Sequence, residues 1–259
     1  MSYGSILAST VGDLAIIRLN DEKSLNAASP QMVEELLDAL GKAAVANRAI
    51  LLTGAGRAFC SGANLGKVDF HHPDYDAGAL LESHFNPLMM AIRGLPVPIV
   101  TAVNGPAVGV GSTIALSGDL VLASDSAYFL QAFRRIGVAP DAGTAYLLTR
   151  SVGRARAMEM ILLAEKISAQ KALDWGLINR VVSPAELDTV ALNMAAGLAA
   201  GPTKTLAEIR KSCWHALDAD FQGQLEHDRV VQRIVGGTAD HREGVAAFFA
   251  KRPAVFTGS

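Results

Sequence analysis

Two short glycine-rich segments constrain the fold of this 259-residue chain more than any other feature. The first, GAGRAFCSGANL at 54–65, follows the apolar run 49–53, and the second, NGPAVGVGSTIA at 104–115, follows the apolar run 99–103. Residues able to start a helix come after each segment. Glycine at such a corner leaves backbone N–H groups open to a ligand, because no Cβ blocks the approach. If the two corners meet, two N–H groups point at one oxygen and form a main-chain oxyanion hole.

The composition is that of a globular protein with one large core, alone or with a small appended domain. Hydrophobic residues make up 50% of the chain, and the formal net charge of −2 argues against a nucleic-acid partner. No apolar run approaches the roughly 20 residues of a membrane span, and the N-terminus lacks the pattern of a secretory signal. Cys60 and Cys213 are the only cysteines, so we expect free thiols and a cytoplasmic location. The six histidines show no metal-ligand spacing, so no metal site is expected.

The spacing of apolar residues predicts an α/β fold. The expected strands are 14–19, 49–53, 98–103, 121–124 and 127–130. Helices alternate with them, and the first begins at Pro30 after an N-cap at Ser29. This order indicates stacked strand–strand–helix units rather than one simple doubly wound sheet.

The second half of the chain, from about Asp141 onward, reads as mainly helical. Ser168 is expected to cap a short helix, and Pro184 and Pro202 to open two longer ones. The final helices carry more apolar residues than their own neighbours can bury. We therefore expect them to pack on another subunit.

Five motifs resemble, in order, those of the enoyl-CoA hydratase/isomerase (crotonase) family. They are FCSGANL at 59–65, NGPAVGVG at 104–111, SDSAYF at 124–129, IGVAPDAG at 136–143 and REGVAAFFAKRP at 242–253. Each motif alone is moderately specific, but together they cover nearly the whole chain. The resemblance implies a spiral of ββα units over residues 1–200 and a C-terminal helical trimerisation region over residues 201–259. It also implies a homotrimer or a dimer of trimers.

The resemblance further implies an acyl-CoA substrate and a site for it. The family stabilises negative charge on the thioester oxygen with two backbone N–H groups. By position these donors are the N–H groups of Ala63 and Val110. The family often has glycine at the second position, and valine keeps the N–H if the turn needs no positive φ there. Further residues expected to bind the CoA thioester are Lys23, Leu25, Asn64, Leu65 and Gly66. No cofactor is expected besides the coenzyme A of the substrate.

Two positions depart from the hydratases of the family, which place two glutamates around a water molecule. By position these glutamates correspond to Thr113 and Phe133, and neither side chain can act as a carboxylate base. Phe133 also occupies the space that the water needs. The sequence therefore predicts feeble hydratase activity.

Asp141 matches the position at which enoyl-CoA isomerases of the family carry their single acid. The segment 136–143 also resembles the ring 1,2-epoxyphenylacetyl-CoA isomerases. A double-bond shift needs one base that takes a proton from one carbon and returns it two carbons away. We therefore expect an enoyl-CoA double-bond isomerase with Asp141 as the base. In the alternative interpretation, Asp141 is a turn residue that caps the following helix.

Two other functions stay open at this point. One is an enoyl-CoA hydratase or an acyl-CoA hydrolase with a different base, and the other is a catalytically silent acyl-CoA-binding protein. Loop residues and lysines supply further candidates, although solvated side chains are the simpler interpretation for all of them. They are His71, His72, His84 and Asp69 for the chemistry, and Lys67 and Lys251, with Lys23, for the CoA phosphates.

Overall fold

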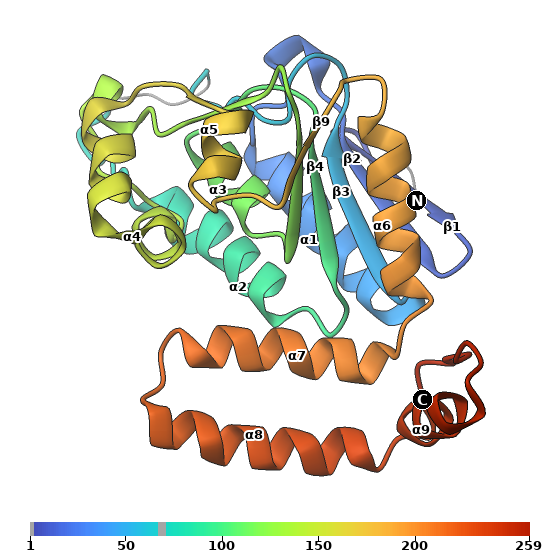
Figure 1. Cartoon of the computed structure of the whole chain (residues 1–259). Helices are drawn as coiled ribbons and strands as arrows, with labels where there is room; N and C mark the ends of the chain where they lie inside the picture. The colour runs from blue at the N-terminus through green and yellow to red at the C-terminus, as the bar shows by residue number, and fades with distance from the viewer. Residues whose placement is uncertain (1–2, 67–70) are drawn as a thin grey trace.

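A six-stranded sheet lies at the centre of the protein (Figure 1). The computed structural model describes residues 3–66 and 71–259. The strand order is β1-β2-β3-β4-β6-β9, with β1 antiparallel to β2 and every other neighbouring pair parallel. The strands are β1 (Ile6–Val11), β2 (Leu14–Leu19), β3 (Ala49–Gly54), β4 (Ile99–Val103), β6 (Leu120–Ser124) and β9 (Arg180–Val182). The predicted α/β class is confirmed.

The central strands are buried on both faces, and alternate residues serve different layers because successive side chains point to opposite sides. Ile50 and Leu52 of β3 belong to the core shared with the first three helices. Ala49 and Leu51 belong to the core shared with α6 (Leu187–Ala199). This two-sided burial explains the continuous apolar run. The first three helices are α1 (Pro30–Ala46), α2 (Asn86–Gly94) and α3 (Val110–Leu116).

The predicted helix caps are present. The Ser29 hydroxyl accepts a hydrogen bond from the Met32 N–H at 3.2 Å, so α1 begins at Pro30 as predicted. Ser168 caps α5 (Ala169–Asp174) in the same way. The boundary expected at Pro184 is wrong by three residues, because 184–186 form a turn and α6 begins at Leu187.

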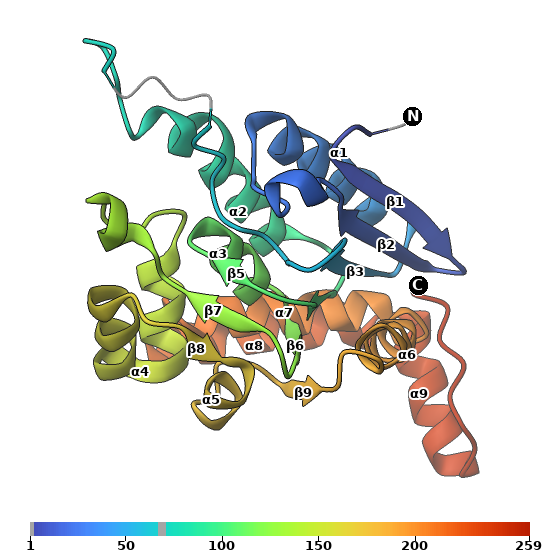
Figure 2. The same cartoon turned by 90° about the horizontal axis from the view of Figure 1, so that it is seen from above.

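A second, smaller layer of short strands runs beside the central sheet, as Figure 2 shows. It contains β5 (Ala107–Val108), β7 (Tyr128–Leu130) and β8 (Ile167–Ser168), in the order β5-β7-β8. Isolated bridges Cys60–Ala107 and Ala28–Ala63 extend this row to the first glycine-rich segment. Successive units therefore contribute one strand to the central sheet and one short stretch to the second layer.

The first glycine-rich segment forms no helix in the described residues up to Gly66. That segment stays extended because its backbone is hydrogen-bonded on both sides, to Ala28 and to Val108. The next helical residues form a π-helical turn over Leu81–Phe85 that leads into α2. The second segment does pass into a helix, α3, as predicted.

The C-terminal helices α7 (Thr203–Ala216) and α8 (Phe221–Gly236) lie side by side below the core in Figure 1, and α9 (Ala239–Ala250) stands beside the C-terminus. Large apolar side chains face outward here: Phe221 is 80% exposed, and Phe248 and Phe249 are each 78% exposed. Among the described residues, no helix is both long and apolar enough to cross a membrane. The role of this region in trimerisation stays a prediction.

Candidate active site

The two glycine-rich segments meet. The Val108 N–H donates to the Cys60 carbonyl at 2.9 Å, and the Phe59 N–H donates to the Pro106 carbonyl at 3.1 Å. The segments approach so closely that a Cβ on Gly111 would lie 2.5 Å from the Cys60 carbonyl oxygen. Only glycine fits at that position, since real Cβ contacts are not that short. The juxtaposition that a shared oxyanion hole requires is therefore part of the fold.

Val110 is the first residue of α3, and its N–H lies at the open end of that helix. The unusual backbone conformation falls on Gly109, with φ 53° and ψ −128°, and Val110 is not among the residues with positive φ. The condition for valine to replace glycine at this position is therefore met. The first N–H groups of a helix have no intrahelical partner, so the Val110 N–H is available to a ligand.

Ala63 lies in the parallel bridge to Ala28. The bridge uses the N–H groups of Ala28 and Asn64, which donate to the carbonyls of Gly62 and Ala28 at 2.8 and 3.1 Å. Because alternate peptide groups of an extended chain point in opposite directions, the Ala63 N–H points away from Ala28. Within the described part of the chain, neither the Ala63 nor the Val110 N–H donates a hydrogen bond.

The predicted CoA-binding residues surround this pair of loops. The Leu25 carbonyl accepts a hydrogen bond from the Ser61 N–H at 3.0 Å, and Lys23 is exposed in the preceding turn. The Asn64 carboxamide holds the Gly66 N–H at 3.1 Å, and Leu65 and Gly66 are exposed. These residues are thus near the loops in the fold, and their contact with CoA stays a prediction.

Asn26, which the sequence did not single out, fixes the turn before α1 to the first loop. Its fully buried amide donates to the carbonyls of Ala55 and Ala58 at 2.9 Å each, and its oxygen accepts from the Asp21 N–H at 2.8 Å. The bonds to Ala55 and Ala58 join residues that are distant in sequence, and the bond from Asp21 lies within a turn. No periodicity signals such a role.

Asp141 lies in the turn before α4 (Thr144–Leu163), and its side chain does not cap that helix. The N-cap is Gly143, without a side-chain hydrogen bond, and the carboxyl Oδ1 of Asp141 is buried without any partner. Desolvation by burial raises the pKa of Asp141 above its ordinary value, and a bond to its own backbone lowers it in part. An unpaired, partly desolvated carboxyl group is typical of a general base. Asp141 is thus a turn residue, as the alternative interpretation expected, but its side chain does not cap α4.

At the two positions that correspond to the glutamates of the hydratases, this chain has Thr113 and Phe133. Thr113 is buried in α3, and its hydroxyl lies 2.6 Å from that of Thr144 in α4. Phe133 is buried in a short 3-10 turn, Phe133–Ile136. Asp141 lies in the turn before α4, and its role as the base stays a prediction. Thr144 carries no signal in the sequence, because nothing in its neighbourhood marks it as a partner of Thr113.

The remaining candidate residues that the structure describes are exposed or have hydrogen-bond partners of their own. His84 contacts Ser83 through Nδ1 at 2.7 Å and Glu34 through Nε2 at 3.3 Å, and His71 and His72 are exposed. Lys251 is exposed and ends α9. The predictions for Lys67 and Asp69 lie outside the described residues. Both cysteines are free, and burial raises the pKa of the Cys60 thiol to about 11, which keeps it protonated and unreactive.

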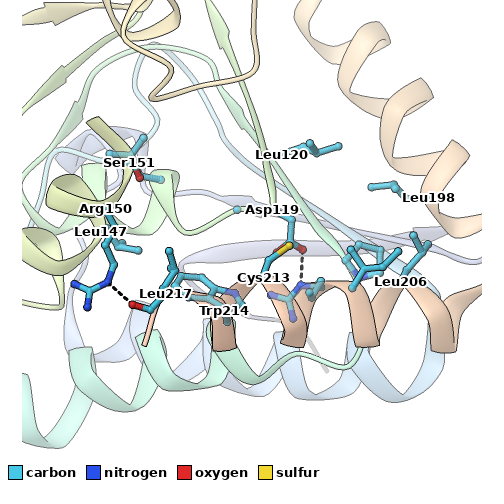
Figure 3. Close-up of a pocket in the computed structure, with 15 residues that line it drawn as sticks. Asp119, Leu120, Leu147, Arg150, Ser151, Leu198, Leu206, Cys213, Trp214 and Leu217 are labelled. Carbon is cyan, nitrogen blue, oxygen red and sulfur yellow. Dashed lines mark hydrogen bonds and ion pairs between the residues drawn. The ribbon is translucent and has the colours of Figure 1, made fainter. Parts of the chain in front are cut away.

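A cavity of about 460 Å³ lies between α7 and the core, and Figure 3 shows it. It is lined mainly by apolar side chains, among them Leu147, Leu206 and Trp214, together with the ion pair of Asp119 and Arg210. None of the predicted site residues lines it. The cavity is therefore distinct from the loops that carry Ala63 and Val110.

Comparisons with known proteins agree with this geometry. The family model described as enoyl-CoA hydratase/isomerase matches residues 10–259. A "Probable enoyl-CoA hydratase" of Rhodobacter capsulatus is 43% identical over 258 residues, covering 100% of both chains. A "1,2-epoxyphenylacetyl-CoA isomerase" of Escherichia coli K12 is 41% identical and covers 98% of both chains. The solved structure of an enoyl-CoA hydratase subunit from Geobacillus kaustophilus superposes with a TM-score of 0.92 at 34% identity and covers 99% of both chains.

The chain belongs to the enoyl-CoA hydratase/isomerase family. The crotonase fold expected from the five motifs is confirmed by the solved structures that it resembles over its whole length. The protein is accordingly an acyl-CoA enzyme of this family. Its relatives carry both hydratase and isomerase names, so family membership alone does not distinguish the two reactions.

Proposed function

We propose that the protein is an enoyl-CoA isomerase that moves a carbon–carbon double bond relative to the thioester carbonyl. The observation that carries the proposal is the carboxyl group of Asp141, which is partly desolvated and has one buried oxygen without a partner. Thr113 and Phe133 occupy the two positions at which hydratases of the family hold their acids. One base suffices for isomerisation, whereas hydration is better served by two.

In the proposed reaction, the N–H groups of Ala63 and Val110 bind the thioester oxygen. Asp141 removes a proton from the carbon next to the carbonyl, and the electron pair of that C–H bond forms the enolate. The same carboxyl group then returns the proton two carbons away, which shifts the double bond into conjugation. Removing one oxyanion donor typically costs about 3–4 kcal/mol of transition-state stabilisation, so two donors account for much of the barrier lowering.

The substrate class is proposed to be CoA thioesters rather than free acids. The loops around Ala63 and Val110 offer N–H donors suited to a carbonyl oxygen, and Lys23 is an exposed cation beside them. Leu25, Asn64, Leu65 and Gly66 are proposed to contact the CoA thioester near these donors. Calorimetry with an acyl-CoA and its matching free acid tests this assignment, and equal affinity for the two would contradict it.

A second candidate is the rearrangement of a ring epoxide. The relative named 1,2-epoxyphenylacetyl-CoA isomerase is 41% identical over almost its whole length. Such a thioester could use the same oxyanion donors and the same carboxyl group. The hydratase or hydrolase alternative is kept because a relative at 43% identity is named a probable hydratase. A silent acyl-CoA-binding protein is the remaining alternative.

We also propose that the protein assembles as a homotrimer or a dimer of trimers. The support is the outward-facing apolar surface of α8 and α9, which includes Phe221, Leu225, Phe248 and Phe249. Exposed apolar area of this kind is unusual on a monomer and typical of an interface. Sedimentation at micromolar concentration is expected to give a trimer or a multiple of it, and a monomer would contradict the proposal.

The experiment that tests the reaction uses three thioesters and one assay in deuterated water. A 3-enoyl-CoA is expected to yield the 2-enoyl-CoA, with deuterium incorporated to the extent that the protonated Asp141 carboxyl exchanges with solvent before it returns the proton, while crotonyl-CoA is hydrated only feebly. Mass spectrometry detects both outcomes, and a ring 1,2-epoxyacyl-CoA tests the second candidate. Efficient hydration of crotonyl-CoA would favour the hydratase alternative. Binding with neither isomerisation nor exchange at any carbon would favour the silent binder.

A further inference from the structure

Two buried threonine hydroxyls join α3 and α4. Helix α3 carries the proposed oxyanion donor, and α4 follows the proposed base. Thr113 in α3 and Thr144 in α4 are 1% and 2% exposed, and their Oγ1 atoms lie 2.6 Å apart. They are 31 residues apart in sequence and come from consecutive units of the fold. A short hydrogen bond in a dry interior is strong and directional, so this contact fixes the spacing of the two helices.

On the side of α3, the contact reaches the peptide group that contains the proposed donor. Thr113 Oγ1 lies 3.4 Å from the Gly109 carbonyl oxygen, which also accepts from the N–H groups of Ser112 and Thr113 at 2.9 and 3.2 Å. The Gly109 carbonyl and the Val110 N–H belong to one planar peptide unit. Donors on the carbonyl therefore orient the N–H and polarise it toward a developing negative charge.

On the side of α4, the contact reaches the turn that holds the carboxyl group. The Thr144 N–H donates to the Asp141 carbonyl at 2.8 Å, which closes the turn Asp141–Ala142–Gly143. Ala142 and Gly143 both have positive φ, 48° and 79°. An alanine in this region carries strain that the surroundings must hold in place. Since the Asp141 side chain has no fixing partner of its own at Oδ1, its position depends on this backbone turn.

The hydroxyl protons can be assigned along the chain of contacts. Each threonine has one proton to donate and can accept as well. If Thr113 donates to the Gly109 carbonyl, it accepts from Thr144, so both protons are used and no buried hydroxyl is left without a role. The contacts then form one continuous path from the Val110 peptide unit to Asp141.

We propose that Thr113 and Thr144 are positioning residues that hold the Val110 N–H and the Asp141 carboxyl group in the geometry needed for proton transfer. The inference rests on the proposed isomerase function. Neither threonine touches the reacting atoms in this account. Their effect is on catalysis rather than on binding, because a misplacement of about 1 Å in a catalytic group can cost on the order of 100-fold in rate.

The test compares Thr113→Val, Thr144→Val and the double variant in the isomerase assay. Each single variant is expected to lower kcat about tenfold with KM changed less than threefold, since the proposed contacts with the CoA moiety are untouched and the Val110 N–H acts mainly on the charge that develops on the enolate oxygen. The double variant is expected to be no worse than the poorer single variant, because both break the same path. Thr113→Ser and Thr144→Ser keep a hydroxyl and are expected to recover most of kcat.

Thr101→Val is the matched control. Thr101 is also fully buried, and its hydroxyl donates to the Ala115 carbonyl at the opposite end of α3 at 2.7 Å. This variant is expected to lose thermal stability but to keep kcat within twofold. If it loses as much kcat as Thr113→Val, or if the Thr113 and Thr144 effects multiply, the positioning role is refuted. If the valine variants do not fold, serine variants with kcat below a third of the parent would also refute it.

The failure of this inference is distinguishable from the failure of the proposed function. If Asp141→Asn is inactive while Thr113→Val retains the parental kcat, only the positioning role is wrong. If the parent neither isomerises 3-enoyl-CoA nor exchanges protons in deuterated water, both are wrong.

Discussion

Replacing Arg210 by methionine is expected to detach α7 from the core at a large cost in stability. Arg210 is buried, with a side chain only 4% exposed, and its Nε lies 2.5 Å from Asp119 Oδ2. Its two terminal nitrogens donate to main-chain carbonyls at the end of α2, one of them to Ile92 at 3.0 Å and the other to Leu95. One side chain thus joins α7, α2 and the start of β6.

The magnitude follows from what methionine leaves behind. Removing one partner of a buried ion pair typically costs about 3–5 kcal/mol, because the other charge stays buried. The two carbonyls also lose their donors, at about 1–3 kcal/mol each if they remain dry. A cavity of about 460 Å³ lies beside Asp119 (Figure 3), and in the variant it gives water room to reach the stranded polar groups, so we do not expect the full sum. We expect a loss of about 3–4 kcal/mol in the free energy of unfolding.

Urea unfolding followed by tryptophan fluorescence, at one fixed protein concentration, measures this loss. Lys204→Met is the control on the same helix, since Lys204 is exposed and is expected to change the stability by less than about 1 kcal/mol. Adding Asp119→Asn to Arg210→Met removes the stranded charge and is expected to restore part of the stability. A loss below about 1 kcal/mol for Arg210→Met, or a further loss on adding Asp119→Asn, would refute the reasoning.

Three further predictions concern pH and packing. Burial raises the pKa of Asp141 above its ordinary value of 3.8, and the base must be ionised to accept a proton. The value of kcat/KM should therefore fall on acidification with a midpoint above pH 3.8. A pH–rate profile that stays flat down to pH 3.8 would contradict this. The Arg252 guanidinium lowers the pKa of Glu243 from 4.5 to about 2, so the stability that Glu243 contributes is present above pH 4.5 and is lost as the pH falls toward 2. Melting curves should accordingly separate Glu243→Gln from the parent at pH 7 but not at pH 2, and an equal separation at both would be contrary evidence. Gly111→Ala places a Cβ 2.5 Å from the Cys60 carbonyl oxygen, so it should lower the melting temperature and abolish turnover, and a fully active variant would show that the loops are not tightly joined.

The sequence was informative where a local pattern determines the structure. The apolar run at 49–53 became β3 because a strand buried on both faces needs apolar residues at every position. Ser29 followed by Pro30 marked the start of α1 to the residue. The positions of Ala63, Val110 and Asp141 were reached through motifs whose order along the chain is specific.

What the sequence did not reveal depends on contacts between distant residues. β5 and β8 contain two residues each, too few for any periodicity. β1 is an edge strand with mostly exposed residues, so it lacks an apolar signal. The contact of Thr113 with Thr144 exists only because the fold stacks two units, and a lone threonine in a helix gives no sign of its partner.

Deuterium exchange by Asp141→Asn tests the central claim most directly. Asparagine keeps the shape of the side chain but cannot take up a proton, and a positioned base typically contributes on the order of 10²–10⁴-fold to the rate. The variant is incubated with a 3-enoyl-CoA in deuterated water, and its acyl-CoA affinity and melting temperature are measured in parallel. We predict that exchange and isomerisation fall by at least about 100-fold while affinity and melting temperature stay close to those of the parent. Near-parental exchange would contradict the account and would mean that a residue other than Asp141 is the base.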